Sequence, residues 1–124
     1  MTIMDAICRI DELKPNSYSQ VDKIKWLSSL DGLIKSEIID THKGGEDVVF
    51  SGYNENSDIS TILLIPAPYD DIYLRWLEAQ IDYANGEYGK YNNSITAYND
   101  ACAIYQRYYN RTHMPISKGT KFKF

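Results

Sequence analysis

The residues best suited to catalysis or metal binding are few in this sequence and poorly spaced for either. His42 and His113 lie far apart in the chain, each at the predicted end of a helix, where a protonated imidazole complements the helix dipole. His42 could join Glu46 and Asp47 as metal ligands. One imidazole and two loop carboxylates beside a diglycine form a weak ligand set, however, so we predict no metal site and no cofactor.

The acidic stretches also lack an arrangement directed at a substrate. Residues 54–58 imitate the start of a calcium-binding loop, but Ile59 and Ile65 stand where an EF-hand needs Gly and Glu. Asp70 and Asp71 are adjacent, so their side chains diverge around a helix, and the favourable position of acids at a helix N-terminus explains them. The sequence has neither a glycine-rich phosphate loop nor a paired CxxC motif. We therefore predict that the chain is not an enzyme.

The charge of the chain divides unevenly along its length. Arg111, Lys118, Lys121 and Lys123 are the only charged residues after position 110, so this end carries +4 while the first 110 residues carry −8. An acidic body argues against general nucleic-acid binding, because phosphate contacts require a basic face. The basic end could contact an anionic partner, and we favour an acidic protein surface.

The composition indicates one folded domain with an unusual aromatic content. The 124 residues are 44% hydrophobic and 24% charged, as is typical of a globular protein. Eleven tyrosines against three phenylalanines favour surfaces that are half-buried, or buried on assembly. Cys8 and Cys102 fall on apolar helical stripes, so we expect both to be small core residues. Residues 62–65 form the longest apolar run and cannot span a bilayer, and the first residues lack signal-peptide features, so we expect a soluble, cytoplasmic chain.

Two helices separated by a proline are predicted in the first third of the chain. One spans about residues 3–14 and ends before Pro15, because proline disfavours helical geometry in the residue that precedes it. The other spans about residues 20–41, with Ser19 as its N-cap. Gly32 inside it indicates either a close helix contact or a tolerated glycine. Their apolar stripes are Ile3, Met4, Ile7, Ile10 and Leu13 in the first helix, and Val21, Ile24, Leu27, Leu30, Ile34 and Ile38, widened by Leu33, in the second.

The middle of the chain has the pattern of a β-hairpin. Residues 47–53 and 60–65 are rich in β-branched and aromatic side chains, and the polar residues 54–59 between them are typical of a turn. We therefore predict a short two-stranded hairpin over about residues 47–65. A lone hairpin is marginally stable in water, so it must pack on the helices or pair with another subunit.

Two more helices complete the predicted fold, over about residues 70–85 and 89–112. The last has a heptad-like seam, which consists of Tyr91, Ile95, Tyr98, Cys102, Tyr105 and Tyr109. The predicted fold class is therefore mainly α: about four helices arranged as two helical hairpins, with the β-hairpin inserted between them. Residues 1–112 form a single domain, and residues 113–124 form a basic tail that we expect to be flexible. The predicted core consists of Ile7, Ile10, Leu27, Leu30, Ile34, Trp76, Leu77 and Ile95.

The candidate interface residues lie in the basic tail and on the second helix. In the tail, basic and aromatic side chains alternate, a pattern that could add as an edge strand to a partner. Trp26 lies off the centre line of its helix, where it could be an exposed anchor or could fill the cleft beside Trp76. The candidates are Lys118, Lys121, Phe122, Lys123, Phe124 and Trp26.

Four segments carry a resemblance to a known family. They are residues 14–27 (KPNSYSQVDKIKWL), 66–82 (PAPYDDIYLRWLEAQID), 85–93 (NGEYGKYNN) and 108–113 (YYNRTH). Together they resemble the small head–tail connector, or adaptor, proteins of tailed bacteriophages and prophages, especially those of Gram-positive anaerobic bacteria. The resemblance covers nearly the whole chain and rests on overall pattern, since these proteins carry no catalytic motif.

The resemblance implies a structural component of the virion. Such connectors are mostly helical and form a ring beneath the portal, where they extend the DNA channel and offer a platform to the next neck protein. The implied partners are the portal protein, the downstream neck or tail-completion protein and further copies of the chain, with only non-specific proximity to DNA and no membrane. The implied location is the virion neck, and the host bacterial cytoplasm during assembly. An acidic channel wall would repel DNA and let it slide. The alternative is a small phage-encoded interaction or regulatory module without a virion role.

Overall fold

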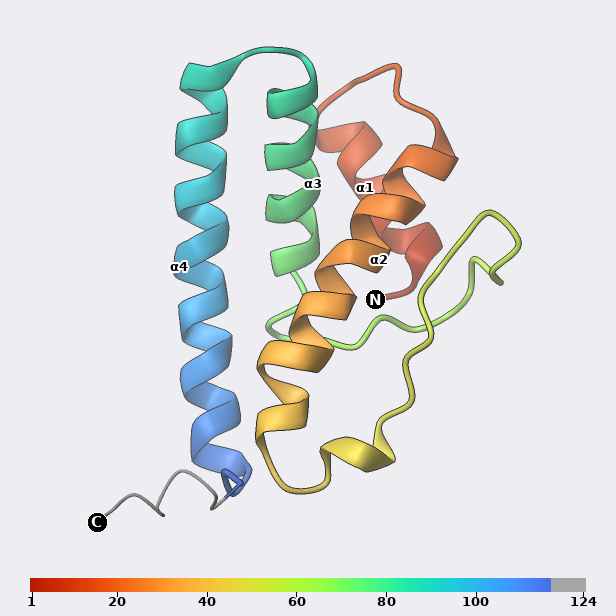
Figure 1. The fold of residues 1–124 in the computed structure, drawn as a ribbon. Helices are drawn as coiled ribbons and strands as arrows, with labels where there is room; N and C mark the ends of the chain where they lie inside the picture. The colour runs from red at the N-terminus through yellow and green to blue at the C-terminus, as the bar shows by residue number, and fades with distance from the viewer. Residues whose placement is uncertain (117–124) are drawn as a thin grey trace.

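The computed structural model describes residues 1–116, which form a mainly helical domain (Figure 1). Two helices, α3 and α4, stand side by side as an antiparallel pair, and α1 and α2 pack on the other side of α3 (Figure 1). The predicted architecture of four helices is therefore confirmed. The helices are α1 (Ile3–Leu13), α2 (Gln20–Glu37), α3 (Ile72–Ala84) and α4 (Tyr88–Thr112), and two 3₁₀ turns, η1 (Ile39–Thr41) and η2 (Gly45–Asp47), follow α2.

The ends of the first two helices follow from side-chain caps. Thr2 and Asp5 form a capping box at the start of α1, each side chain accepting the other's backbone N–H. Ser19 caps α2 as predicted, because its Oγ accepts a hydrogen bond of 3.1 Å from the Asp22 N–H. The α-helix ends at Glu37 and continues only as the turn η1, where the Thr41 hydroxyl donates to the Ile38 carbonyl. The predicted end near residue 41 was therefore slightly late.

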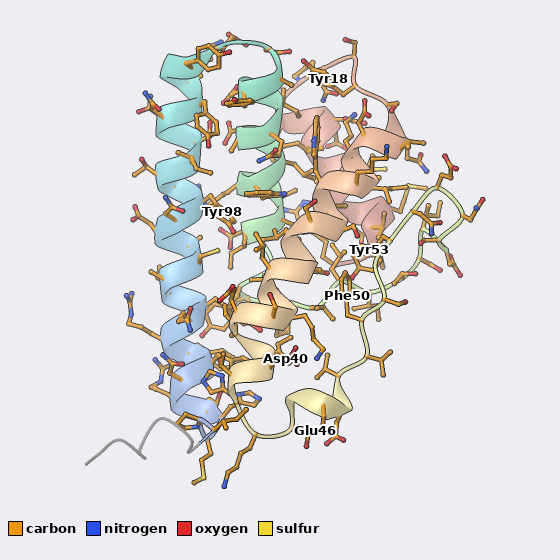
Figure 2. All side chains as sticks on the ribbon, viewed as in Figure 1. Tyr18, Asp40, Glu46, Phe50, Tyr53 and Tyr98 are labelled. Atoms are coloured by element: carbon orange, nitrogen blue, oxygen red, sulfur yellow. The ribbon has the colours of Figure 1, made fainter. Side chains whose placement is uncertain are left out.

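The core lies between α1, α2 and α3, and α4 adds tyrosines to one side of it. Most of the predicted core residues are buried, and they are Ile7, Ile10, Leu27, Leu30, Ile34 and Leu77. Trp76 is partly buried against the core, whereas Ile95 lies outside the core cluster. The seam of α4 is buried mainly through Tyr105 and Tyr109. Tyr98 packs against Trp76 of α3, with 4.9 Å between the ring centroids (Figure 2).

The predicted β-hairpin is wrong. Residues 48–71 cross the molecule as an irregular segment, and within residues 1–116 the extended pairing is limited to two isolated bridges, Thr2 with Ile62 and His42 with Pro115. The side chains that suggested strands are split between core and solvent: Ile65 is buried, whereas Val49 is 87% exposed and Ile62 is 73% exposed.

The physical reason is that both predicted strands find their hydrogen bonds elsewhere. The N-terminal residues pair with the second segment, since the Ile3 N–H donates to the Thr61 carbonyl and the Leu63 N–H to the Met1 carbonyl. The first segment is held by α2, because the Tyr53 N–H donates to Ser28 Oγ at 2.9 Å. With these groups satisfied, the two segments have no need of each other.

A buried carboxylate on α2 organises the same segment. Asp31 is fully buried and accepts three hydrogen bonds. The hydroxyls of Tyr53 and Tyr73 each donate to it at 2.6 Å, and the Leu64 N–H donates at 3.1 Å. The Tyr73 hydroxyl in turn accepts from the Ile65 N–H at 2.7 Å. Asp31 therefore fixes residues 53–65 against α2 and α3 from within.

The chain after α4 begins with a short extended pairing. The Lys43 N–H donates to the Met114 carbonyl at 2.7 Å, and the Ile116 N–H donates to the Thr41 carbonyl at 3.0 Å. Residues 114–116 are thus held antiparallel to residues 41–43 at the foot of α4. None of the helices in residues 1–116 combines the length and the apolar character required to cross a membrane.

Candidate interaction surface

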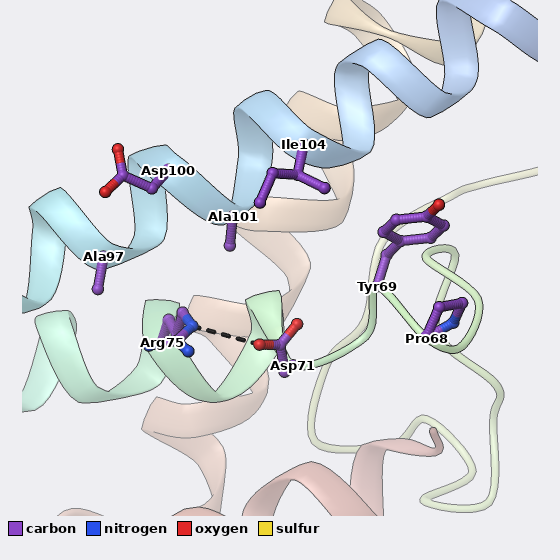
Figure 3. Close-up of a pocket in the computed structure, with 8 residues that line it drawn as sticks. All are labelled: Pro68, Tyr69, Asp71, Arg75, Ala97, Asp100, Ala101 and Ile104. Atoms are coloured by element: carbon purple, nitrogen blue, oxygen red, sulfur yellow. Dashed lines mark hydrogen bonds and ion pairs between the residues drawn. The ribbon is translucent and has the colours of Figure 1, made fainter.

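A groove opens between the start of α3 and the middle of α4, and we call it the α3–α4 groove (Figure 3). Its volume is about 390 Å³, and its apolar lining consists of Pro68, Tyr69, Ala97, Ala101 and Ile104. The two alanines leave space beside α3, and Ile104 is 50% exposed. The groove therefore presents apolar surface to solvent between two rigid helices.

The rim of the α3–α4 groove is charged. Arg75 and Asp71 lie one turn apart on the α3 side, with 3.3 Å between Arg75 Nε and Asp71 Oδ2 (Figure 3). Asp100 stands on the α4 side and forms no ion pair with any residue among positions 1–116. A ligand entering the groove therefore meets an apolar floor and an uncompensated carboxylate.

A second groove lies on the other side of α3, between it and α1, and we call it the α1–α3 groove. It has a volume of about 330 Å³ and an apolar lining of Ile10, Leu13 and Leu74. Leu13 is 68% exposed. Asp71 and Arg75 belong to both grooves, and Glu78 completes the rim of the second. Together, the linings of the two grooves contain three carboxylates and one guanidinium group.

The loop before α3 is fixed against α4 by aromatic contacts. Tyr69 stacks on Tyr108, with ring centroids 4.6 Å apart, and packs at a tilt against Tyr105 at 5.6 Å. These contacts hold one wall of the α3–α4 groove in place. The excess of tyrosine in the sequence is thus partly explained by intramolecular packing between the loop and α4.

Buried ionisable side chains of residues 1–116 are used in internal contacts. Lys23 Nζ donates to Asp11 Oδ1 at 2.6 Å and to the Tyr18 carbonyl at 2.9 Å. Asp82 receives a hydrogen bond from the Ser94 hydroxyl, and its Oδ1 lies 2.8 Å from Lys14 Nζ. These contacts link α1 with α2 and α3 with both α1 and α4.

Asp31 shows the same internal use. Its burial raises the pKa of the carboxyl, and the hydrogen bonds from Tyr53, Tyr73 and the Leu64 N–H oppose this effect only in part. Burial beside this carboxylate also raises the pKa of both tyrosine hydroxyls, which remain protonated donors. The cluster lies inside the fold, away from the lining of either groove.

The three residues weighed as metal ligands are not brought together. His42 is buried and turned toward α4, with Nδ1 2.6 Å from the Ile38 carbonyl oxygen and Nε2 2.8 Å from Asn110 Oδ1. Glu46 and Asp47 are exposed on η2 (Figure 2). Over residues 1–116, no group of three His, Cys, Asp or Glu side chains is placed to hold a metal ion.

The expectation of a buried Cys8 is wrong. Cys8 is exposed, and its thiol lies 3.5 Å from the sulfur of Met4 on the outer side of α1. The core face of α1 instead consists of Ile3, Ala6, Ile7 and Ile10. Cys102 is half-buried on α4, where burial raises the pKa of its thiol.

Trp26 is placed by the structure, whereas the tail candidates are not. The Trp26 ring is partly buried and meets the Tyr18 ring edge-on at 5.6 Å, and its carbonyl accepts from Trp76 Nε1 at 2.8 Å. The ring therefore packs beside Tyr18 at the edge of the core, and a role of Trp26 at an interface stays a prediction. Lys118, Lys121, Phe122, Lys123 and Phe124 lie outside the described residues.

The two grooves themselves were missed by sequence reasoning. Ile104 interrupts the polar face of α4 outside the predicted seam, whereas Leu13 belongs to the predicted apolar stripe of α1 but is exposed in the second groove. An apolar residue displaced from a helical stripe was the available signal.

No protein-family model, curated protein or solved structure matches the chain.

Proposed function

We propose that this protein is a head–tail connector of a tailed bacteriophage or prophage. In this role it forms a ring, binds the portal protein, joins the capsid to the tail and extends the DNA channel toward the downstream neck protein. It acts as a structural component of the virion neck, assembled in the host cytoplasm, and performs no catalysis.

The observation that carries the proposal is the packing of the segments that resemble connectors. Tyr18 and Trp26 belong to residues 14–27, whereas Trp76 and Asn85 belong to the later segments. The Tyr18 hydroxyl donates to Asn85 Oδ1 at 2.6 Å, and Trp76 Nε1 donates to the Trp26 carbonyl at 2.8 Å. Two hydrogen bonds therefore join segments that are distant in sequence but share the resemblance, which supports reading them as a common structural unit.

The surface of the molecule supports binding over catalysis. Its buried ionisable groups are engaged within the fold, as Asp31 and Asp82 illustrate. Apolar side chains instead reach the surface in two grooves with charged rims. Apolar hollows surrounded by polar residues are typical of protein-interaction sites.

Co-assembly with the portal protein encoded in the same genome tests the proposal. The full chain and the portal are mixed, and the complex is weighed by native mass spectrometry and imaged by electron microscopy. We expect a ring of this protein stacked on the portal ring. Absence of any complex would contradict the connector role.

Disruption of the gene provides an independent test. We expect lysates with filled heads and free tails that do not join, and restoration of complete particles by the gene supplied in trans. Normal infectious particles without the protein would favour the regulatory alternative.

A further inference from the structure

We propose that residues 117–124 of one copy bind the α3–α4 groove of a second copy. In this contact Phe122 and Phe124 cover the apolar floor, and the tail lysines lie at the acidic rim. The inference deepens the proposed function and rests on it in one respect: a contact from tail to groove between identical subunits is the kind that builds a ring.

The chemistry of the two surfaces is complementary. Residues 117–124 (SKGTKFKF) contain three lysines, two phenylalanines and no acid. The α3–α4 groove has an apolar floor and a rim of Asp71, Arg75 and Asp100. Arg75 pairs with Asp71, so Asp100 leaves the rim with one net negative charge. In an extended segment, Phe122 and Phe124 fall on one side and Lys121 and Lys123 on the other. Such a segment can place aromatic rings on the floor while its ammonium groups remain near the carboxylates and water.

The position of the last described residues favours a second copy over the chain's own groove. Residues 114–116 are held against residues 41–43, beside the α4 face that contains Asn110 and Tyr109. Successive residues advance by about 100° around a helix, so this face is roughly opposite to the one with Ala101 and Ile104. A tail that starts there must pass around α4 to reach its own groove.

The length of the tail sets how far it can extend from Ile116. Eight residues follow Ile116, and an extended chain of eight residues reaches at most about 28 Å. Because tail and groove are different surfaces of the same chain, the contact is heterologous. Each subunit offers one tail and one groove, so repetition of the contact gives a closed ring or an open chain.

A photo-crosslinking experiment on the full chain identifies the occupant. p-Benzoylphenylalanine replaces Phe122, and the protein is a mixture of ¹⁴N-labelled and ¹⁵N-labelled copies. We expect a covalent dimer in which the tail peptide of one isotope is joined to residues 97–104 of the other. The same probe at Val49, an exposed position away from both grooves, is the matched control and should not label that segment. Cross-links within one copy, or to another surface, would overturn the proposal.

Matched substitutions test the energetics by sedimentation analysis. Ile104→Glu should weaken self-association at least tenfold, whereas Ala103→Glu, the neighbouring exposed position outside the groove, should not. Lys121→Glu should weaken it to a similar degree and Lys25→Glu should not, although both change the net charge equally. Unchanged melting temperatures show that the variants remain folded.

Mixing the two defective variants tests the heterologous geometry. Ile104→Glu retains its tail and Lys121→Glu retains its groove, so the mixture should give a one-to-one dimer that neither variant forms alone. A full chain that is monomeric at every concentration, or that associates equally well with both substitutions, refutes the tail contact. Portal binding that survives these substitutions leaves the connector role standing, while a tail contact without any portal complex refutes only the connector role.

Discussion

Residues 53–65 are held by hydrogen bonds to one buried carboxylate, that of Asp31, and not by the backbone hydrogen bonds of the predicted β-hairpin. Asp31→Ala leaves two tyrosine hydroxyls and the Leu64 N–H without their acceptor. Each buried group without a partner costs about 1–3 kcal/mol, so we expect a loss of roughly 3 kcal/mol or more in the free energy of unfolding, measured by urea denaturation. A loss below 1 kcal/mol would show that residues 53–65 are held by other contacts.

The pH dependence of Asp31 has a definite sign. Burial raises its pKa in the folded chain above the usual value, which is about 4. The protonated carboxyl is thus favoured by folding, so its contribution to stability is complete below the unfolded pKa and is lost as the pH rises through the folded pKa. We expect wild type to gain stability relative to Asp31→Asn as the pH falls from 7 toward 4. A difference that is constant with pH would contradict the raised pKa.

Two glycines provide a matched pair of opposite effects. A Cβ at Gly32, within α2, would meet Phe50 at an ordinary distance of 3.8 Å, whereas one at Gly45 would clash with the Ile39 carbonyl oxygen. Alanine in a helix is favoured over glycine by about 1 kcal/mol. Gly32→Ala should therefore raise the melting temperature, and Gly45→Ala should lower it. Gly32 is thus a tolerated glycine, not a mark of close helix contact.

At the scale of elements, two leucines show which face of α2 packs on the core. The sequence pattern placed both Leu30 and Leu33 on the apolar side of the helix. Leu30 is fully buried, and Leu33 is 48% exposed. Leu30→Ala should cost roughly 2–5 kcal/mol of stability because it leaves a cavity, while Leu33→Ala should cost much less. Equal losses in chemical denaturation would mean that α2 presents a different face to the core.

The helices could be predicted from sequence, and the segment between α2 and α3 could not. Apolar residues at helical spacing and caps such as Ser19 act locally, so they place helices nearly correctly. Val49 and Ile62 have strand propensity, but the partners that decide their segment, Asp31 and the N-terminal residues, are distant in sequence. Strand propensity describes a fit to a half-buried pleated surface, and this segment pairs only through an isolated bridge at Ile62.

The grooves of the candidate interaction surface also could not be predicted from local sequence patterns. A groove depends on how far two helices stand apart, and Ala97 and Ala101 reveal this only once α3 is placed beside them. Trp26 was recognisable as a notable residue, but its backbone hydrogen bond with Trp76, fifty positions away, could not be predicted from its own helix. Long-range packing decides both features.

At the scale of the whole molecule, we predict that residues 117–124 are not required for the fold. The core is built from residues 3–109, and the pairing with residues 41–43 ends at Ile116. Deleting residues 117–124 should therefore leave the melting temperature and the denaturant dependence of unfolding unchanged. A cut before Pro115 should be less well tolerated, because it removes the Ile116 hydrogen bond to Thr41. A large loss of stability from the shorter deletion would show that the tail contributes to the fold.

The pairing of residues 114–116 with residues 41–43 also determines how the molecule bears mechanical load. A pull on the tail along the strand direction stretches the bonds of Lys43 and Ile116 together, since both cross between the same two segments. Force therefore enters at the junction of η1 and the foot of α4, where His42 joins the two through Ile38 and Asn110. We therefore expect a pulling force to break these hydrogen bonds before it unwinds the last turn of α4. Until they break, the force is shared between α4 and the end of α2 with η1.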